Sequence, residues 1–376
     1  ALIIFIKEET PMAFTAQDVK NLREKTGVGM MECKKALTEA DGDMDRAFEI
    51  LRERGLAASE KKASRIAAEG AIIAYTDEAS KTTVLLEINS ETDFVGKNEK
   101  FQEFGLNVAK TIAANKPASV EALADLKLVD SDRTVTENLN DLILVIGENL
   151  KIRRFEIIEG DVVTYIHGGG AVGVAVKFET NLADKAEFVA MGKNIAMQVA
   201  AMSPQYLGKE SISDDELAKM KSITIDSSLN KPDSLPKPIL NALFDKAIAE
   251  NLFSAEDAAA YEENKKSPYL FNFLSKEAVA TLAQLAIAGK DEYIENKIFA
   301  GAVEGRIKKQ IKETCLLEQA FVRSDLFDGS VSGYVADVAK KNGADVKVVN
   351  FIRLEKGEGL EKREDNFADE VASMMK

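Results

Sequence analysis

Apolar residues in the first sixty positions recur at helical spacing and predict three short helices. Thr15 is placed to cap the first helix, and the second is expected to begin at Met30. The third is expected to follow Asp43 and to stop at Gly55, because glycine often ends a helix. The predicted inward-facing residues are Val19, Leu22, Cys33, Ala36, Leu37, Ala47, Phe48 and Leu51. Residues 12–66 are therefore predicted to form a three-helix module.

Beyond this module the pattern changes to two alternating strands followed by an amphipathic helix, and this unit occurs twice. The predicted strands are 69–75 and 84–88 in the first copy, and 159–165 and 172–176 in the second. In the helices that follow, Phe101, Gly105, Asn107, Ala109, Ala113, Ala114 and Pro117 recur as Phe188, Gly192, Asn194, Ala196, Ala200, Ala201 and Pro204. Each copy is expected to form an antiparallel sheet with one face covered by its helix. The predicted fold class is α+β, with a duplicated core.

The remaining segments complete the predicted domain organisation. Residues 146–157 join the two copies and end in a strand, and a further strand is expected at 346–353. A helix-rich stretch interrupts the second copy, and a short terminal helix carries Phe367, Val371 and Met374 on one face. The predicted division is a dispensable leader at 1–11, the three-helix module at 12–66, the first repeat at 67–159, the second repeat at 160–205 and 301–356, a helical protrusion at 206–300, and a C-terminal module at 357–376.

The two copies differ most sharply in the loop after their second strand. The first reads Glu91-Thr92-Asp93-Phe94-Val95-Gly96 and the second Glu179-Thr180-Asn181-Leu182-Ala183-Asp184. Because both copies must build the same local fold, shared residues are expected to be scaffold, and function is expected where the copies diverge. An isolated aromatic is usually a core residue, but the second copy has no aromatic to match Phe94. Phe94 is therefore predicted to lie at an interface.

Composition limits the classes of partner and location. The chain has 376 residues and is 45 % apolar, which is ample for a core. Its net charge of -14 argues against bulk binding to nucleic acid or to an anionic membrane, because both need a positive field. No stretch approaches the roughly 20 apolar residues of a membrane helix. Only two cysteines are present, Cys33 and Cys315, which favours a reducing, cytoplasmic setting.

Catalytic and cofactor motifs are scarce. His167 is the single histidine, and neither cysteine has a neighbouring metal ligand, so zinc sites and Cys/His nucleophiles have little support. The run Gly168–Gly173 satisfies G-x-G-x-x-G, but it leads into a strand where a dinucleotide loop would open a helix. It is therefore predicted to be a hairpin turn, with His167 beside it as a solvated turn residue. No cofactor and no metal are predicted, and the sequence leaves carboxylate acid–base pairs open.

Several long motifs, in order along nearly the whole chain from Met12, resemble the elongation factor Ts family, the bacterial nucleotide-exchange factors of elongation factor Tu. They lie at 22–37, 92–95, 146–154, 303–309, 351–353 and 357–359. The resemblance implies a module like a ubiquitin-associated domain, a two-part core, a helical protrusion and a short C-terminal module. It also implies a non-enzymatic exchange factor whose Asp93-Phe94 motif enters the partner's GTPase domain near the magnesium and phosphates.

The resemblance also assigns residues that contact elongation factor Tu. These are Thr92, Asp93, Phe94 and Val95 in the loop, Arg23, Met30, Met31 and Lys34 in the N-terminal module, and His167 facing the partner's third domain. Two adjacent helical methionines cannot both face inward, so at least one is expected to be exposed. An adaptor that binds ubiquitin-like proteins through the three-helix module is the alternative function, and a nucleotide-dependent enzyme would rest only on the glycine run. A homodimer through the protrusion stays open.

Overall fold

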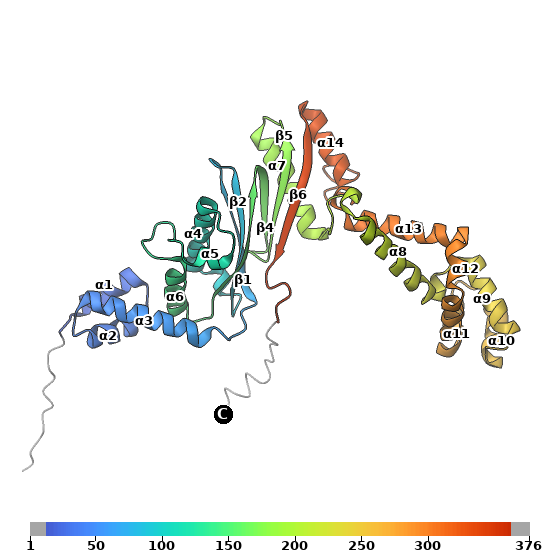
Figure 1. Cartoon of the computed structure of the whole chain (residues 1–376), viewed down its shortest axis with the longest axis horizontal. Coiled ribbons are helices and arrows are strands. Elements are labelled where there is room, and N and C mark those ends of the chain that lie inside the picture. Colours follow the sequence, from blue (N-terminus) through green and yellow to red (C-terminus); the bar gives the residue numbers. More distant parts are fainter. Residues whose placement is uncertain (1–12, 362–376) are drawn as a thin grey trace, which may run out of the picture. The chain divides into compact units, whose positions relative to one another are not determined.

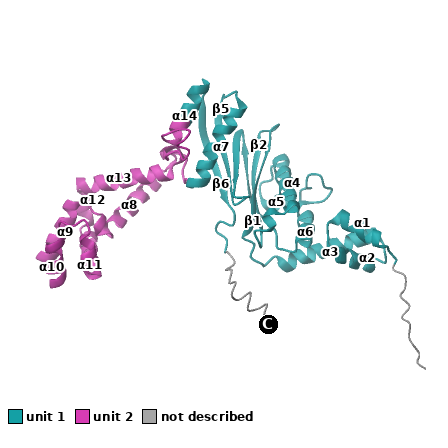
Figure 2. Cartoon of the chain, turned by 180° about the vertical axis from the view of Figure 1, so that it is seen from behind, with its two compact units in different colours: residues 1–203, 335–376 teal, residues 204–334 magenta. Residues whose placement is uncertain are grey.

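The computed structural model describes residues 13–361, and it combines helices with two small antiparallel sheets, which confirms the predicted α+β class (Figure 1). The chain divides into two compact units, one formed by residues 1–203 with 335–376 and the other by 204–334 (Figure 2). The predicted leader 1–11 and the terminal residues Phe367, Val371 and Met374 lie outside the described residues. No helix within 13–361 is both long and apolar enough to cross a membrane.

The first unit begins with the three predicted helices, α1 (Ala16–Thr26), α2 (Met30–Glu39) and α3 (Met44–Lys62). Thr15 and Asp18 form a capping box at α1, which confirms the predicted cap, and Asp43 caps α3 through the backbone N–H of Arg46. The predicted stop at Gly55 is wrong, since α3 continues to Lys62. Gly55 is buried, and a Cβ there would lie 3.2 Å from the backbone oxygen of Asn140. This glycine serves close helix packing, and it does not end the helix.

Two three-stranded antiparallel sheets form the core of the first unit, in the orders β1-β2-β3 and β4-β5-β6. Their strands are β1 (Glu69–Asp77), β2 (Thr82–Ser90), β3 (Lys151–Glu159), β4 (Asp161–His167), β5 (Val172–Thr180) and β6 (Val346–Glu355). One buried cluster joins the inner faces of both sheets and contains Ile72, Leu85, Ile158, Ala175 and Leu354. The strands predicted from alternation are thus present, except that Glu159 ends β3 and the first strand of the second copy begins at Asp161.

Helices cover the outer faces of these sheets. They are α4 (Glu99–Asn115), which packs on β1 and β2, and α7 (Lys185–Met202), which packs on β4 and β5 (Figure 1). Two further helices, α5 (Val120–Ala124) and α6 (Val135–Ile146), follow α4, and α6 packs against α3. All nine residues of β2 are buried, because both faces of this central strand are covered. The loop that follows β2 therefore starts from a rigid strand.

The glycine run between β4 and β5 forms the predicted hairpin turn. Gly168, Gly169 and Gly170 have φ values of 58°, 64° and 99°, which suit glycine. The carbonyl of Gly170 accepts a 2.8 Å hydrogen bond from the N–H of Ile72 in β1, so the turn packs on the first sheet. These residues are hairpin scaffold, and the helix that a dinucleotide loop requires does not follow them.

The second unit is helical and has its own core. Its α-helices are α8 (Asp214–Leu229), α9 (Lys237–Ala249), α10 (Ala255–Asn264), α11 (Lys276–Ala288), α12 (Lys290–Glu295) and α13 (Lys297–Thr314). Its 3-10 turns are η2 (Lys209–Ser211), η3 (Pro232–Ser234), η4 (Leu270–Phe273) and η5 (Leu316–Glu318). The helix α14 (Val331–Asn342) crosses the boundary between the two units. Phe299, Val303 and Ile307 of α13 are buried in this helical core. The boundary predicted at residue 300 therefore falls inside a helix that the unit's core uses.

A buried carboxylate links the end of the second sheet to the first. Glu87 in β2 is fully buried and accepts hydrogen bonds from Arg153 (2.9 Å) and Arg154 (2.6 Å) of β3. It also accepts from the backbone N–H of Gly357 at 2.8 Å and from the side-chain amide of Asn89 at 3.1 Å. The turn after β6 is thus held against the first sheet through one carboxylate.

Candidate functional site

The loop after β2 presents a large aromatic side chain to solvent. Phe94 is 78 % exposed, the highest value among the large apolar side chains of the described residues. Its neighbour Val95 is 6 % exposed and belongs to the core of the first repeat, while Asp93 on the other side is exposed. The core alternative for Phe94 is therefore wrong in the free chain. Val95 anchors the loop, and Asp93 and Phe94 project from it.

The segment after Phe94 is fixed by close packing and capping. The 3-10 turn η1 (Val95–Lys97) contains Gly96, where a Cβ would lie 2.5 Å from the backbone oxygen of Gly70 in β1. Only glycine fits at this close approach. Asn98 then caps α4 by accepting from the N–H groups of Lys100 and Phe101. The loop is thus held at its C-terminal end by backbone contact and a helix cap.

The segment before Phe94 is held by the connector between α6 and β3. Glu148 in this connector accepts hydrogen bonds from both the backbone N–H (2.9 Å) and the hydroxyl (2.6 Å) of Thr92. In return, Glu91 accepts a 2.6 Å hydrogen bond from the backbone N–H of Asn149. Glu148 and Asn149 could not be predicted as supports from the sequence, because they lie 56 and 58 residues from their partners and no local spacing indicates the contact.

An open groove lies beside the exposed ring. It has a volume of about 400 Å³ and is lined by Phe94, Val95, Asn98, Lys100, Val145 and Ile146. Four of these six residues are apolar and one is a lysine. The structure therefore combines a protruding aromatic with an adjacent depression that has both apolar and polar lining, which is an arrangement suited to a protein partner.

The matching loop of the second repeat has no such projection. Leu182, at the position of Phe94, is half-buried. Its backbone N–H donates a 3.0 Å hydrogen bond to the hydroxyl of Thr180, which in turn donates to the carbonyl of Asp345 at 2.9 Å. The two copies thus share a scaffold and differ in what their loops expose, as the sequence divergence predicts.

The other predicted contact residues lie on two separate parts of the first unit. Arg23, at the end of α1, and Met30, Met31 and Lys34 of α2 are all exposed, the two methionines by 42 % and 66 %. This confirms the expectation that at least one methionine faces solvent. His167 is exposed at the end of β4, where its Nδ1 lies 3.0 Å from the hydroxyl of Tyr165.

Comparison with known proteins decides the family. A family model described as elongation factor TS matches residues 91–358, from the first residue of the Phe94 loop to the turn after β6. The chain belongs to the elongation factor Ts family. Curated relatives named elongation factor Ts are 39 % identical in Syntrophotalea carbinolica (97 % of this chain, 100 % of the relative), 39 % in Clostridium perfringens (96 % and 98 %) and 38 % in Clostridioides difficile (96 % and 99 %). The relatives therefore match this chain over almost its whole length.

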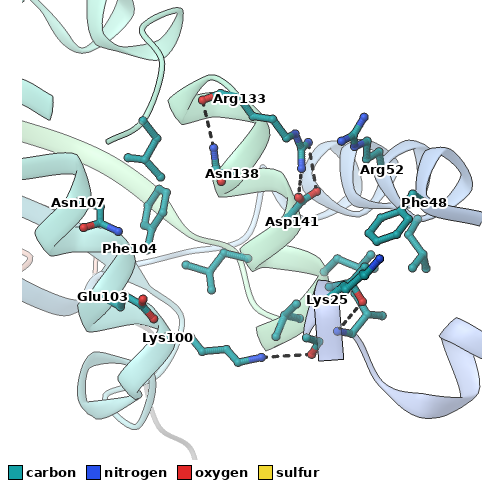
Figure 3. A pocket seen from close by; sticks show the side chains of 18 of the residues that line it. Lys25, Phe48, Arg52, Lys100, Glu103, Phe104, Asn107, Arg133, Asn138 and Asp141 are labelled. Atoms are coloured by element: carbon teal, nitrogen blue, oxygen red, sulfur yellow. Dashed lines mark hydrogen bonds and ion pairs between the residues drawn. The ribbon is translucent and has the colours of Figure 1, made fainter. Parts of the chain in front are cut away.

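A second cavity lies between α1 and α3 on one side and α4 and α6 on the other (Figure 3). It has a volume of about 620 Å³ and carries both signs of charge, with Lys25, Arg52, Lys100 and Arg133 set against Glu24, Glu103 and Asp141. Arg133 is paired with Asp141, and Lys100 donates to the carbonyl of Gly27 at 3.3 Å, as Figure 3 shows. This mixture of charges does not select an anion or a cation. Within residues 13–361, no three His, Cys, Asp or Glu side chains gather where they could hold a metal ion.

Proposed function

We propose that this chain is the guanine-nucleotide exchange factor of elongation factor Tu and promotes GDP release without chemistry of its own. Membership of the elongation factor Ts family gives it a role in translation elongation, which takes place in the cytoplasm. The observation that supports the proposal most directly is the 78 % exposure of Phe94 on a loop whose neighbouring residues are fixed. A free protein that exposes such a ring from a rigid loop is prepared to bury it in a partner.

The proposed action is insertion of Asp93 and Phe94 near the magnesium and phosphate groups of the partner. Aromatic anchors that enter a partner's pocket dominate many interfaces. Because Val95 and Thr92 already fix the loop, insertion costs little ordering entropy, which favours affinity. The exposed carboxylate of Asp93 would disturb the groups around the magnesium ion or position the ring beside it.

Exchange then follows from differential binding alone. If the chain stabilises the nucleotide-free partner, GDP and this chain must weaken each other's affinity by the same factor. No covalent step is needed, and the proposed factor acts on nucleotide affinity and release. This is why the absence of catalytic motifs in the sequence is compatible with a large effect on GDP release.

Two further surfaces are proposed to add affinity. The methionines Met30 and Met31 offer an adaptable apolar contact, and Lys34 places positive charge one helical turn from Met30. Arg23, exposed on α1, is a further proposed contact. His167, exposed at the end of β4, is the proposed contact with the partner's third domain. These contacts would align Phe94 with its pocket.

The direct test is release of a fluorescent GDP analogue from elongation factor Tu, measured with and without the chain. Catalytic amounts of the chain are expected to accelerate release, and an unchanged rate would overturn the proposal. A pull-down from bacterial lysate tests the alternative, because an adaptor would retain a ubiquitin-like protein in place of elongation factor Tu. Sedimentation of the free chain tests the proposed homodimer through the helical protrusion.

A further inference from the structure

We propose that Glu148 is a positioning residue for nucleotide exchange, which acts by fixing Thr92 and thereby the direction in which Phe94 projects. The inference rests on the proposed function and names a residue outside the contact surface assigned above. Its basis is a pair of hydrogen bonds from one carboxylate to one residue, two positions before the exposed ring.

The contact is specific in geometry and in chemistry. One oxygen of Glu148 accepts from the Thr92 hydroxyl at 2.6 Å, and the other accepts from the Thr92 backbone N–H at 2.9 Å. Hydrogen bonds to an ionised carboxylate are stronger and shorter than neutral ones. Among the described residues no lysine or arginine pairs with Glu148, so the Thr92 backbone and side chain are its described partners.

The duplicated fold provides an internal comparison. In the second repeat the equivalent Thr180 is also held by the segment just before the third strand of its sheet, but through the neutral backbone carbonyl of Asp345. Asn181 and Asp345 add two further hydrogen bonds there, from the N–H of Asn181 to the carbonyl of Asp345 (3.3 Å) and from the N–H of Asp345 to the side-chain oxygen of Asn181 (2.7 Å). In the copy that exposes an aromatic, both oxygens of one carboxylate instead hold the threonine itself.

The connector that carries Glu148 also reaches the N-terminal module. Gly147, with φ of 86°, ends α6, and α6 packs against α3. The next residue after Glu148 is Asn149, whose side-chain amide donates to the carbonyl of Arg65, just beyond α3, at 2.8 Å. Two consecutive residues therefore tie the Phe94 loop to the chain that leaves the N-terminal module, so that the loop and the Met30–Met31 surface are held in one framework.

The test compares Glu148→Ala and Glu148→Gln with the matched variant Thr180→Val, using full-length chain and elongation factor Tu loaded with a fluorescent GDP analogue. Glu148→Ala is expected to lower the kcat/KM of GDP release roughly 10- to 100-fold, as expected for a misplaced anchor. Thr180→Val is expected to leave kcat/KM unchanged. Glu148→Gln preserves the size of the side chain and keeps the measurement possible if the alanine variant folds poorly, with an intermediate loss expected.

Two readouts separate positioning from a general structural role. In a Phe94→Ala background, adding Glu148→Ala is expected to cause little further loss, because the ring that Glu148 orients is gone. The Thr92 amide is expected to exchange with deuterium faster in Glu148→Ala, and this holds whether or not the chain acts on elongation factor Tu. Equal losses in both backgrounds, an unchanged kcat/KM, or an equal loss in Thr180→Val would overturn the inference. A wild-type chain that fails to accelerate GDP release would overturn the proposed function instead.

Discussion

Gly192 of α7 lies against Val163 of β4 with no space for a side chain between them. A Cβ on Gly192 would lie 2.6 Å from the Cβ of Val163, closer than such atoms approach in proteins. The first repeat has the same contact, where a Cβ on Gly105 of α4 would overlap the Cδ1 atom of Ile73 in β1. The recurrence of this glycine in both copies is therefore explained by the distance between helix and sheet.

Gly192→Ala is expected to destabilise the chain by about 1 to 3 kcal/mol. The new methyl group would overlap the Cβ of Val163, and relieving this overlap requires a shift of the backbone. Gly105→Ala is expected to cost less, since the atom in its way is the far end of the Ile73 side chain and can rotate. Urea unfolding of both variants measures the difference.

The control is Gly301→Ala on α13, where a Cβ would meet nothing within 4 Å. This variant is expected to be more stable by about 0.5 to 1 kcal/mol, because alanine favours the helix. A Gly192→Ala variant as stable as wild type would contradict the close-packing explanation.

Phe94→Ala is expected to weaken catalysed GDP release by about 2 to 4 kcal/mol of interaction free energy, the size typical of a buried aromatic anchor. Its own melting temperature is expected to be nearly unchanged, because the ring is 78 % exposed in the free chain. Leu182→Ala is the matched control and is expected to do the opposite, since Leu182 is half-buried. Stopped-flow release of a fluorescent GDP analogue and thermal melts give both quantities.

If the Phe94→Ala chain melts at a much lower temperature but its folded fraction accelerates GDP release normally, Phe94 has a structural role and the proposed binding role is wrong. A Leu182→Ala chain that loses exchange as strongly as Phe94→Ala would remove the argument from the duplicated loops. Each outcome is independent of the other.

The hydrogen-bond network around Glu87 predicts an acid-sensitive contribution to stability. Burial alone would raise the pKa of Glu87, but hydrogen bonds from Gly357, Asn89, Arg153 and Arg154 outweigh it and hold the pKa below its usual value of 4.5. Because the folded-state pKa is lower than the unfolded one, the contribution is complete above the unfolded pKa and is lost as the pH falls through the folded pKa.

Glu87→Gln is expected to lower the free energy of unfolding at neutral pH by about 2 kcal/mol. This is less than the 3 to 5 kcal/mol of a fully buried broken pair, because Arg153 and Arg154 reach solvent. The gap between wild type and variant is expected to shrink as the pH is lowered from about 5 toward 3. Denaturant unfolding across this range measures the gap, and a gap independent of pH would show that the carboxylate charge does not contribute.

Local signals explain what could be predicted from the sequence. The Thr15 cap, the helix start at Met30 and the hairpin at Gly168 depend on residues within a few positions of one another. The predicted helix end at Gly55 is wrong, because this glycine is required by the close approach of the Asn140 backbone, which is far away in the sequence.

The duplication of the core predicts a difference between the two loops that local patterns do not indicate. It indicated different roles for Phe94 and Leu182, and the exposure of Phe94 beside the half-buried Leu182 agrees with this. It could not indicate Glu148, because the second repeat performs the same task with a backbone carbonyl, and every residue has one. Supports formed by long-range polar contacts are therefore the part of the site that only the structure reveals.

The boundaries of the helical protrusion give the last prediction. The two ends of its helical core lie side by side, where Tyr206 and Cys315 form a β-bridge and the N–H of Leu316 donates to the carbonyl of Tyr206 at 2.9 Å. Excision of 209–312, closed by a Gly/Ser link of about six residues, keeps this bridge and removes the whole helical core. The remaining chain is expected to fold.

Excision of 206–300, the boundary predicted from sequence, is expected to give a less stable or aggregating chain. It removes Tyr206 from the bridge and leaves Val303 and Ile307 of α13 without the core in which they are buried. Apolar side chains exposed in this way favour association. Circular dichroism melts and size-exclusion chromatography of the two variants, made with the same link, measure the difference. An unfolded 209–312 variant would show that the protrusion is required for folding of the core, and equal behaviour of the two variants would show that α13 does not depend on the helical unit.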